Sequence, residues 1–148
     1  MTPIVPDVLT ELAQLLARCA QPDADPAERS ASLGMSALLL GIAAQEWDRA
    51  ADRLVEENAA LRGLFSRAVP VLGDIALTQR LAELAQAGEA DFRVSALERA
   101  NCVLREALID LHVAVETRDD PAGRSLEAEI WAELATSTKR RLLAGSPV

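Results

Sequence analysis

Residues 33–68 read LGMSALLLGIAAQEWDRAADRLVEENAALRGLFSRA and form the longest regular pattern in this 148-residue chain. Counted from Leu33, positions that lie alternately four and three residues apart are apolar, with a single exception. Such spacing places them along one side of a helix, as in the heptad repeat of packed helices. The stretch therefore predicts one long helix with one packing seam, in which Asn58 is the only polar member. The seam consists of Leu33, Ala37, Leu40, Ala44, Trp47, Ala51, Leu54, Asn58, Leu61, Phe65 and Ala68.

The two halves of this helix differ in the residues outside the seam. Residues 31–44 are apolar on almost every side, so we expect this half to lie at the centre of the protein. Residues 45–67 carry charges opposite the seam, which is typical of a surface helix. With expected ends near Pro26 and Val69, the helix spans about 60 Å at 1.5 Å per residue, so it either kinks near a glycine or extends beyond its neighbours. The charges expected in solvent are Glu46, Asp48, Arg49, Asp52, Arg53, Glu56, Glu57 and Arg62.

Four further helices are expected on either side of the long one. Asp25 and Asp120 each precede a proline, which predicts an N-cap followed by a first-turn proline. Ser95 with Glu98 matches a capping box, and Gly145 is expected to end the last helix. The very short turn at residues 119–120 makes the last two helices an antiparallel hairpin. The expected ranges are 6–20, 26–69, 74–87, 96–117 and 121–144.

The composition favours a helical protein. Hydrophobic residues make up 50% of the chain, tyrosine is absent and aromatic residues are 3%. Sheets are enriched in aromatic and β-branched residues, so this composition disfavours them. A chain of this length is one domain by the usual prior. We therefore predict that residues 1–148 form a single all-α domain, an up-and-down bundle of four main helices plus one short helix.

Charge and cysteine content limit the classes of partner. The net charge of −8 opposes binding to nucleic acid, which needs clustered Lys and Arg. The chain starts without the pattern of a signal peptide, and its longest uncharged run, residues 30–45, is too short to span a membrane comfortably. Cys19 and Cys102 lie on apolar helix faces and lack metal-ligand spacing, which predicts two buried thiols in a reduced, cytoplasmic protein. A disulfide between them stays open as an alternative.

The sequence offers little support for catalysis. It contains no phosphate-binding loop and no GxGxxG or GxSxG motif, and His112 is its only histidine. Di-metal carboxylate bundles use two Glu-x-x-His motifs, whereas this chain has none. His112 with Glu116 and Glu46 would make a poor metal site. We expect no catalytic residues, no metal and no cofactor, and a metal-dependent enzyme is only the third interpretation.

Two asparagines interrupt otherwise apolar seams and need hydrogen-bond partners if they are buried. Counting back from the turn at residues 119–120 places Asn101 level with Thr138. If the long helix runs parallel to the last one, Asn58 joins this layer, and Trp47 joins a second layer with Trp131. The pattern predicts that Asn58 and Asn101 belong to one hydrogen-bonded network.

This polar layer has two interpretations. In the first it fixes the register of the helices. In the second it lines a pocket for a small, partly apolar molecule, with Trp47, Asn58, Asn101, Trp131 and Thr138 as ligand-binding residues, although tryptophans at this spacing are more often core residues. The favoured function is a non-catalytic interaction or assembly module that forms a homodimer through the seam within residues 46–67. Small-molecule binding is the alternative.

Overall fold

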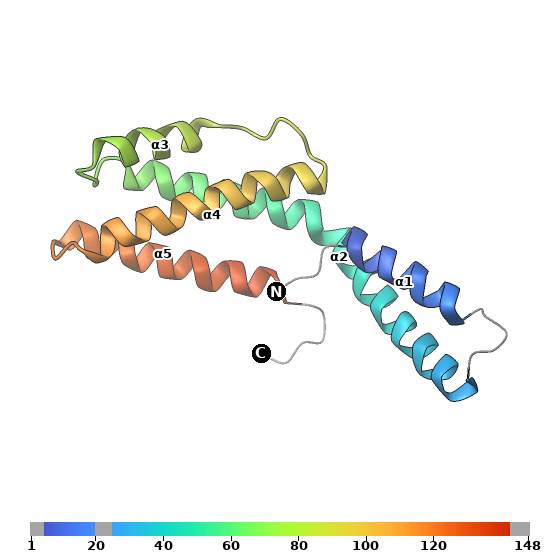
Figure 1. Cartoon of the computed structure of the whole chain (residues 1–148). Coiled ribbons are helices and arrows are strands. Elements are labelled where there is room, and N and C mark those ends of the chain that lie inside the picture. The colour runs from blue at the N-terminus through green and yellow to red at the C-terminus, as the bar shows by residue number, and fades with distance from the viewer. Residues whose placement is uncertain (1–4, 20–24, 143–148) are drawn as a thin grey trace. The chain divides into compact units, whose positions relative to one another are not determined.

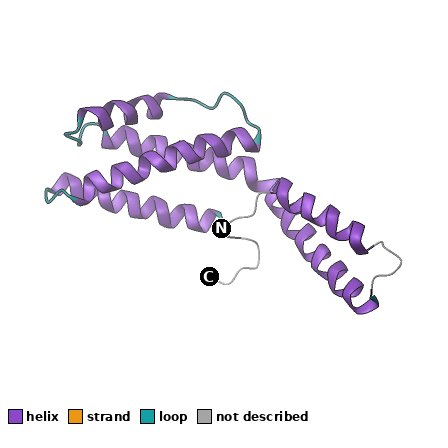
Figure 2. Ribbon diagram, in the orientation of Figure 1, coloured by secondary structure: helices purple, strands orange, loops and turns teal. Residues whose placement is uncertain are grey.

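The computed structural model describes residues 5–19 and 25–142, and these residues form five helices and no strand (Figure 2). The prediction of an all-α protein is therefore confirmed. Most helix ends lie within one or two residues of the predicted ones, which is the usual precision of such boundaries. The last helix ends at Arg140, earlier than predicted, and Gly145 lies outside the described residues. The helices are α1 (Val5–Cys19), α2 (Pro26–Ala68), α3 (Ile75–Gln86), α4 (Val94–Glu116) and α5 (Pro121–Arg140).

Capping explains where α2 and α5 begin. Asp25 accepts a hydrogen bond from the backbone N–H of Glu28 at 3.1 Å, and Asp120 accepts one from Gly123 at 2.9 Å. Both predicted N-caps are thereby confirmed. The capping box at Ser95 is wrong, because α4 begins one residue earlier, at Val94, after an N-cap without a side-chain bond.

The chain divides into two compact units, residues 1–50 with 142–148 and residues 51–141. Helix α2 contributes its first half to one unit and its second half to the other. In the first unit, α1 lies beside the first half of α2 (Figure 1). Leu12 of α1 is buried, as are Ala43 and Ala50 of α2. The described helices of this unit therefore form a two-helix hairpin.

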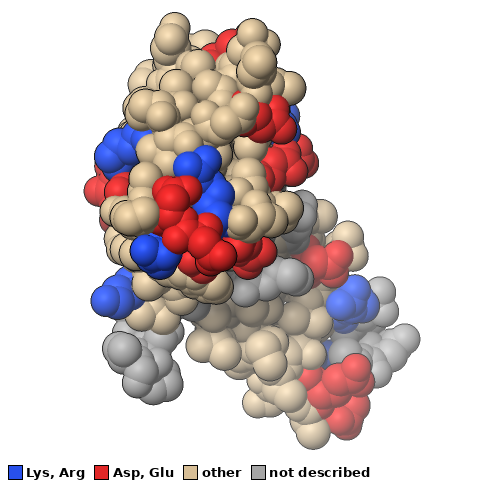
Figure 3. Space-filling view, turned by 90° about the vertical axis from the view of Figure 1, so that its left-hand side faces the viewer, with Lys and Arg blue, Asp and Glu red and all other residues tan. Residues whose placement is uncertain are grey.

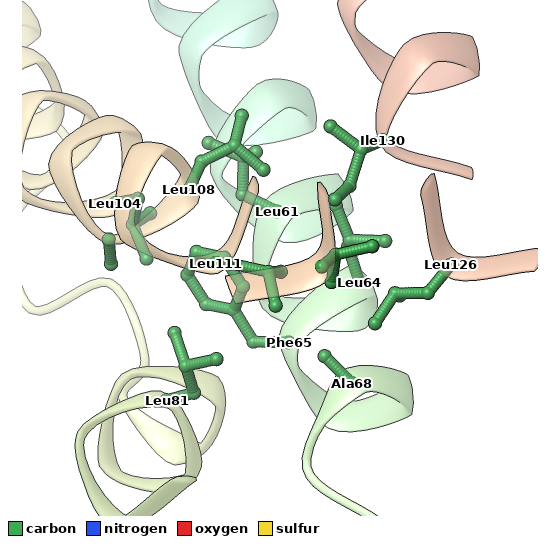
Figure 4. Close-up of a cluster of buried hydrophobic side chains, with 12 residues drawn as sticks. Leu61, Leu64, Phe65, Ala68, Leu81, Leu104, Leu108, Leu111, Leu126 and Ile130 are labelled. Atoms are coloured by element: carbon green, nitrogen blue, oxygen red, sulfur yellow. The ribbon is translucent and has the colours of Figure 1, made fainter. Parts of the chain in front are cut away.

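The second unit contains the larger core. Side chains from α2, α3, α4 and α5 point toward one another in Figure 4. Phe65 of α2 is fully buried, as are Leu81 of α3, Leu111 of α4 and Ile130 of α5. The turn between α4 and α5 is tight, since a Cβ atom at Gly123 would lie 2.8 Å from the Cβ atom of Arg118. The core comprises Leu61, Leu64, Phe65, Ala68, Leu81, Leu104, Ala107, Leu108, Leu111, Val115, Leu126 and Ile130.

The predicted seam of α2 is buried only in the second unit. There Leu54, Asn58, Leu61, Phe65 and Ala68 are all buried. In the first unit the seam residues are exposed, so the prediction that the first half of α2 lies at the centre of the protein is wrong. Within residues 46–67, the seam is covered by this chain from Leu54 onward, whereas Trp47 is exposed, which corrects the predicted location of a dimer interface. The exposed members are Leu33, Ala37, Leu40, Ala44 and Trp47.

A second heptad series, one residue earlier than the seam, forms the buried side of α2 in the first unit. It contains Ser36, Ala43, Glu46 and Ala50, and it continues into the second unit as Arg53 and Glu57. The prediction that Glu46, Arg53 and Glu57 lie in solvent is therefore wrong. With α1 as the neighbouring helix, only one narrow side of the first half of α2 is covered.

The cysteines also differ from expectation. Both thiols are free, Cys19 is half-buried and Cys102 is exposed. The prediction of two buried thiols is wrong, because Cys102 lies one residue beyond the inward-facing Asn101 on α4.

Candidate functional site

Asn58 and Asn101 meet in the interior of the second unit. The side-chain Nδ2 of Asn101 donates to Oδ1 of Asn58 at 2.9 Å, and both residues are buried. Each occupies a seam position between leucines, which directs its amide toward the facing helix. The prediction of one hydrogen-bonded network containing both asparagines is confirmed.

Two carboxylates fix the orientation of these amides. Asn58 Nδ2 donates to Glu89 Oε1 at 3.0 Å and to the backbone oxygen of Leu97 at 3.3 Å. Because a carboxylate can only accept, the nitrogen of Asn58 must face Glu89 and its oxygen must face Asn101. Asn101 Nδ2 also donates to Glu57 Oε2 at 3.4 Å. Reversing either amide would set an oxygen against an oxygen.

Glu57 is the most heavily bonded member of the network, although its side chain is only 2% exposed. Arg141 binds it at two points, with Nε 3.0 Å from Oε1 and Nη2 2.6 Å from Oε2. Ser137 Oγ donates to Oε1 at 3.2 Å, and Arg105 Nη1 lies 3.7 Å from Oε2. A buried carboxylate is tolerated when it is paired and hydrogen-bonded in this way.

Glu89 lies at the other end of the network, in the connection between α3 and α4. Arg62 Nη1 donates to its Oε1 at 2.5 Å. Burial acts to raise the pKa of Glu89, but hydrogen bonds from Arg62 and Asn58 outweigh it, so this pKa lies below the ordinary value for glutamate. The contacts of the charged form therefore stabilise the fold above that ordinary pKa. Their contribution is lost as the pH falls through the lowered pKa.

A cavity of about 310 Å³ adjoins Glu89 and Arg62. Its walls are the connection at residues 87–91, Leu84 of α3 and small apolar side chains of α4 that include Ala100. The Nε atom of Arg62 is buried and has no hydrogen-bond partner among the described residues. A volume near 300 Å³ lies at the lower end of the range for small-molecule sites.

The five residues predicted to bind a ligand are only partly brought together. Asn58 and Asn101 meet, but Thr138 is exposed and its hydroxyl donates to the backbone oxygen of Leu134 at 2.9 Å. The preceding residue, Ser137, occupies the buried position instead. Thr138 was matched by its level along the helix, which does not determine the side of the helix that it occupies.

The tryptophans are not core residues, which corrects their expected role. Trp131 is 55% exposed, and its ring meets the edge of His112 at a centroid distance of 5.3 Å. Trp47 belongs to the first unit and is 71% exposed. Trp47 lies at a seam position, and the first unit leaves that side of α2 uncovered.

Several members of the network were not predicted from the sequence, among them Glu57, Ser137, Glu89 and Arg141. Glu57 continues the buried heptad series of α2, so periodicity carried a signal for its burial. Ser137 lies next to the predicted Thr138. Glu89 lies in the connection between α3 and α4, and Arg141 follows the last residue of α5. Helical periodicity gives no information about residues outside helices.

The described residues contain no group of three or more His, Cys, Asp or Glu side chains that could hold a metal ion together. His112 Nε2 lies 3.7 Å from Glu116 Oε1, with no third ligand. On the face of the molecule in Figure 3, acidic and basic side chains are mixed rather than separated into a basic patch. No helix within residues 5–19 and 25–142 is long and apolar enough to cross a membrane.

Comparison of the chain with protein family models, curated proteins and solved structures finds no match. The surfaces and contacts of the chain itself therefore carry the information about its function.

Proposed function

We propose that this chain is a non-catalytic interaction or assembly module. The observation that carries the proposal is a row of uncovered apolar side chains on the first half of α2. We name it the exposed seam, and it consists of Leu33, Ala37, Leu40, Ala44 and Trp47. Its partner would present a helical or grooved apolar surface, since such surfaces receive residues spaced three and four apart. The homodimer expected from the sequence is one such assembly.

The size and chemistry of the exposed seam support this role. Leu33 is 47% exposed, Leu40 is 44% exposed and Trp47 is 71% exposed. They follow one another at intervals of seven residues, so their apolar surfaces are continuous. Contiguous apolar patches of more than a few hundred Å² are uncommon on monomers and mark interaction sites. Tryptophan is also among the residues that contribute most to binding energy in interfaces.

The proposal also covers the arrangement of the helices and the location of the protein in the cell. We infer an up-and-down bundle as the helical arrangement, and a cytoplasmic location without nucleic-acid or membrane partners. The short connections between successive helices support the arrangement, and the net charge of −8 supports the exclusion of nucleic acid.

A photo-cross-linking amino acid at position 40 tests the interaction role. In living cells it is expected to give one or a few discrete cross-linked products, identified by mass spectrometry. The same amino acid at position 38 is a matched control, because Leu38 is also an exposed leucine of α2 but lies outside the exposed seam. The absence of discrete products at position 40, or equal products at both positions, would contradict the proposal.

Binding of a small molecule is the second candidate function, and the cavity beside Glu89 and Arg62 favours it. The cavity joins the polar layer through the hydrogen bond between Glu89 and Asn58. A ligand would place an apolar body against α4 and a polar group near Arg62. None of the five residues expected to bind a ligand lines this cavity, so it differs from the pocket expected from the sequence.

Ala100→Leu tests this second function by filling the cavity. A thermal-shift screen of small, partly apolar compounds is expected to find binders of the natural chain, because a ligand that binds only the folded state raises Tm. Ala100→Leu should abolish the rise, whereas Ala114→Leu should keep it, because Ala114 is a similarly half-buried alanine of α4 outside the cavity. A screen without binders, or a rise unaffected by Ala100→Leu, would argue against the cavity as a site.

A further inference from the structure

We infer that the exposed seam binds a second copy of the same seam, in antiparallel orientation, as a twofold symmetric dimer. This inference rests on the proposed interaction function and names the partner. The second copy would cover a surface that the described residues of the chain leave exposed.

The alternation of side-chain size along the seam is the main argument. Leu33, Leu40 and Trp47 are large, and the intervening Ala37 and Ala44 are small. When two copies pair antiparallel about position 42, Leu40 lies opposite Ala44 of the second copy. In the same register Trp47 lies opposite Ala37, and twofold symmetry repeats both contacts. Leu40 and Trp47 then each face an alanine of the exposed seam, as close packing requires. Leu33 lies opposite Ala51, which is beyond the exposed seam.

A parallel pair without offset lacks this fit. In a parallel pair without offset, Leu40 would meet Leu40 and Ala44 would meet Ala44, so that crowded layers alternate with gaps. Both crowding and gaps destabilise a packed interface. Twofold dimers are the commonest oligomers, and each needs a surface complementary to itself. The exposed seam satisfies this condition in the antiparallel orientation.

The distribution of charge also permits self-association. With a net charge of −8, two copies repel one another over most approaches. Residues 30–45 carry no charged side chain, so the central part of the seam avoids this repulsion. Gly34 and Gly41 each follow a large seam residue, and a Cβ atom at either would meet nothing within 4 Å. Among the described residues, no contact explains these glycines, and they leave room for a neighbouring backbone.

The arrangement also completes the first unit. Its described part is a hairpin of two helices, which can cover only one side of each. Two copies supply four helical segments, the number that encloses a core in the commonest helical bundles. The second copy therefore supplies the two helices that the hairpin needs to form a four-helix core.

Light scattering on the full chain tests the inference at tens of micromolar protein. The natural chain is expected to have the mass of two chains, and Leu40→Glu is expected to have the mass of one. Leu38→Glu is the matched control and should remain dimeric, because Leu38 is exposed outside the seam. Circular dichroism should show unchanged helix content in both variants, since neither leucine is buried.

The results separate this inference from the function on which it rests. A monomeric natural chain, or a dimer that survives Leu40→Glu, overturns the inference. If position 40 nevertheless cross-links to one different protein in cells, the interaction function stands and only the identity of the partner is wrong. If it gives no discrete product, both are wrong.

The distance between two spin labels tests the orientation. A label at Ser30→Cys, in a chain with Cys19→Ser and Cys102→Ser, marks the same exposed position in both copies. Antiparallel pairing about position 42 separates the two sites by roughly 24 residues, or about 36 Å along the helix axis. Parallel pairing brings them to about the spacing of packed helices, roughly 10 Å. A distance in that shorter range overturns the antiparallel arrangement.

Discussion

Glu57→Ala is expected to lower the free energy of unfolding of the second unit by about 3 kcal/mol. The substitution removes the acceptor for Arg141, Ser137 and Asn101 at once. Breaking a buried ion pair from one side costs about 3–5 kcal/mol. The lower end applies here because Arg141 is partly exposed and can turn toward water. The Asn101 amide and the Ser137 hydroxyl stay buried and lose a partner.

Glu56→Ala is the matched control for this measurement. Glu56 is the preceding residue of α2, its side chain is 57% exposed, and it lies 3.4 Å from Arg140. An exposed ion pair contributes only about 0–1 kcal/mol. Urea unfolding followed by the fluorescence of Trp131, in a chain that carries Trp47→Phe, reports on the second unit through its only tryptophan. Similar losses for the two variants would show that Glu57 has no special role in the interior.

The sequence predicted the helices, but it predicted the buried side of α2 correctly only for the second half of that helix. The seam from Leu33 to Ala68 is apolar along its whole length, and periodicity correctly predicted one long helix. Periodicity identifies an apolar side of a helix, but it carries no information about which element covers that side. Leu54 and Phe65 face other helices of their own unit, whereas Leu40 and Trp47, with the same spacing, remain exposed.

The polar network was predictable where the partners lie on regular helices. Asn58 and Asn101 could be matched because both interrupt an apolar seam and a buried amide needs a partner. Glu57 was expected in solvent, because hydropathy counts its charge but cannot show that Arg141 neutralises it. Glu89 contacts Asn58 across 31 residues from an irregular connection, and no local pattern indicates such a contact.

Phe65→Ala is expected to destabilise the second unit by about 3–5 kcal/mol. Phe65 is fully buried in the core between α2, α3 and α4, next to Leu81 and Leu111 (Figure 4). Truncation removes its buried apolar area and leaves a cavity that these neighbours fill only in part, which is the origin of losses of this size. Since native domains are stable by about 5–15 kcal/mol, the variant should unfold at a much lower urea concentration.

Phe92→Ala provides the control within the same unit. Phe92 is the only other phenylalanine, and it is 66% exposed in the connection between α3 and α4. The two substitutions delete the same atoms, so any difference between them reports burial alone. Phe92→Ala should change the free energy of unfolding by less than about 0.5 kcal/mol, as expected for a surface position. If Phe65→Ala were equally mild, Phe65 could not lie in the packed core, and the seam of α2 would have no structural role in this unit.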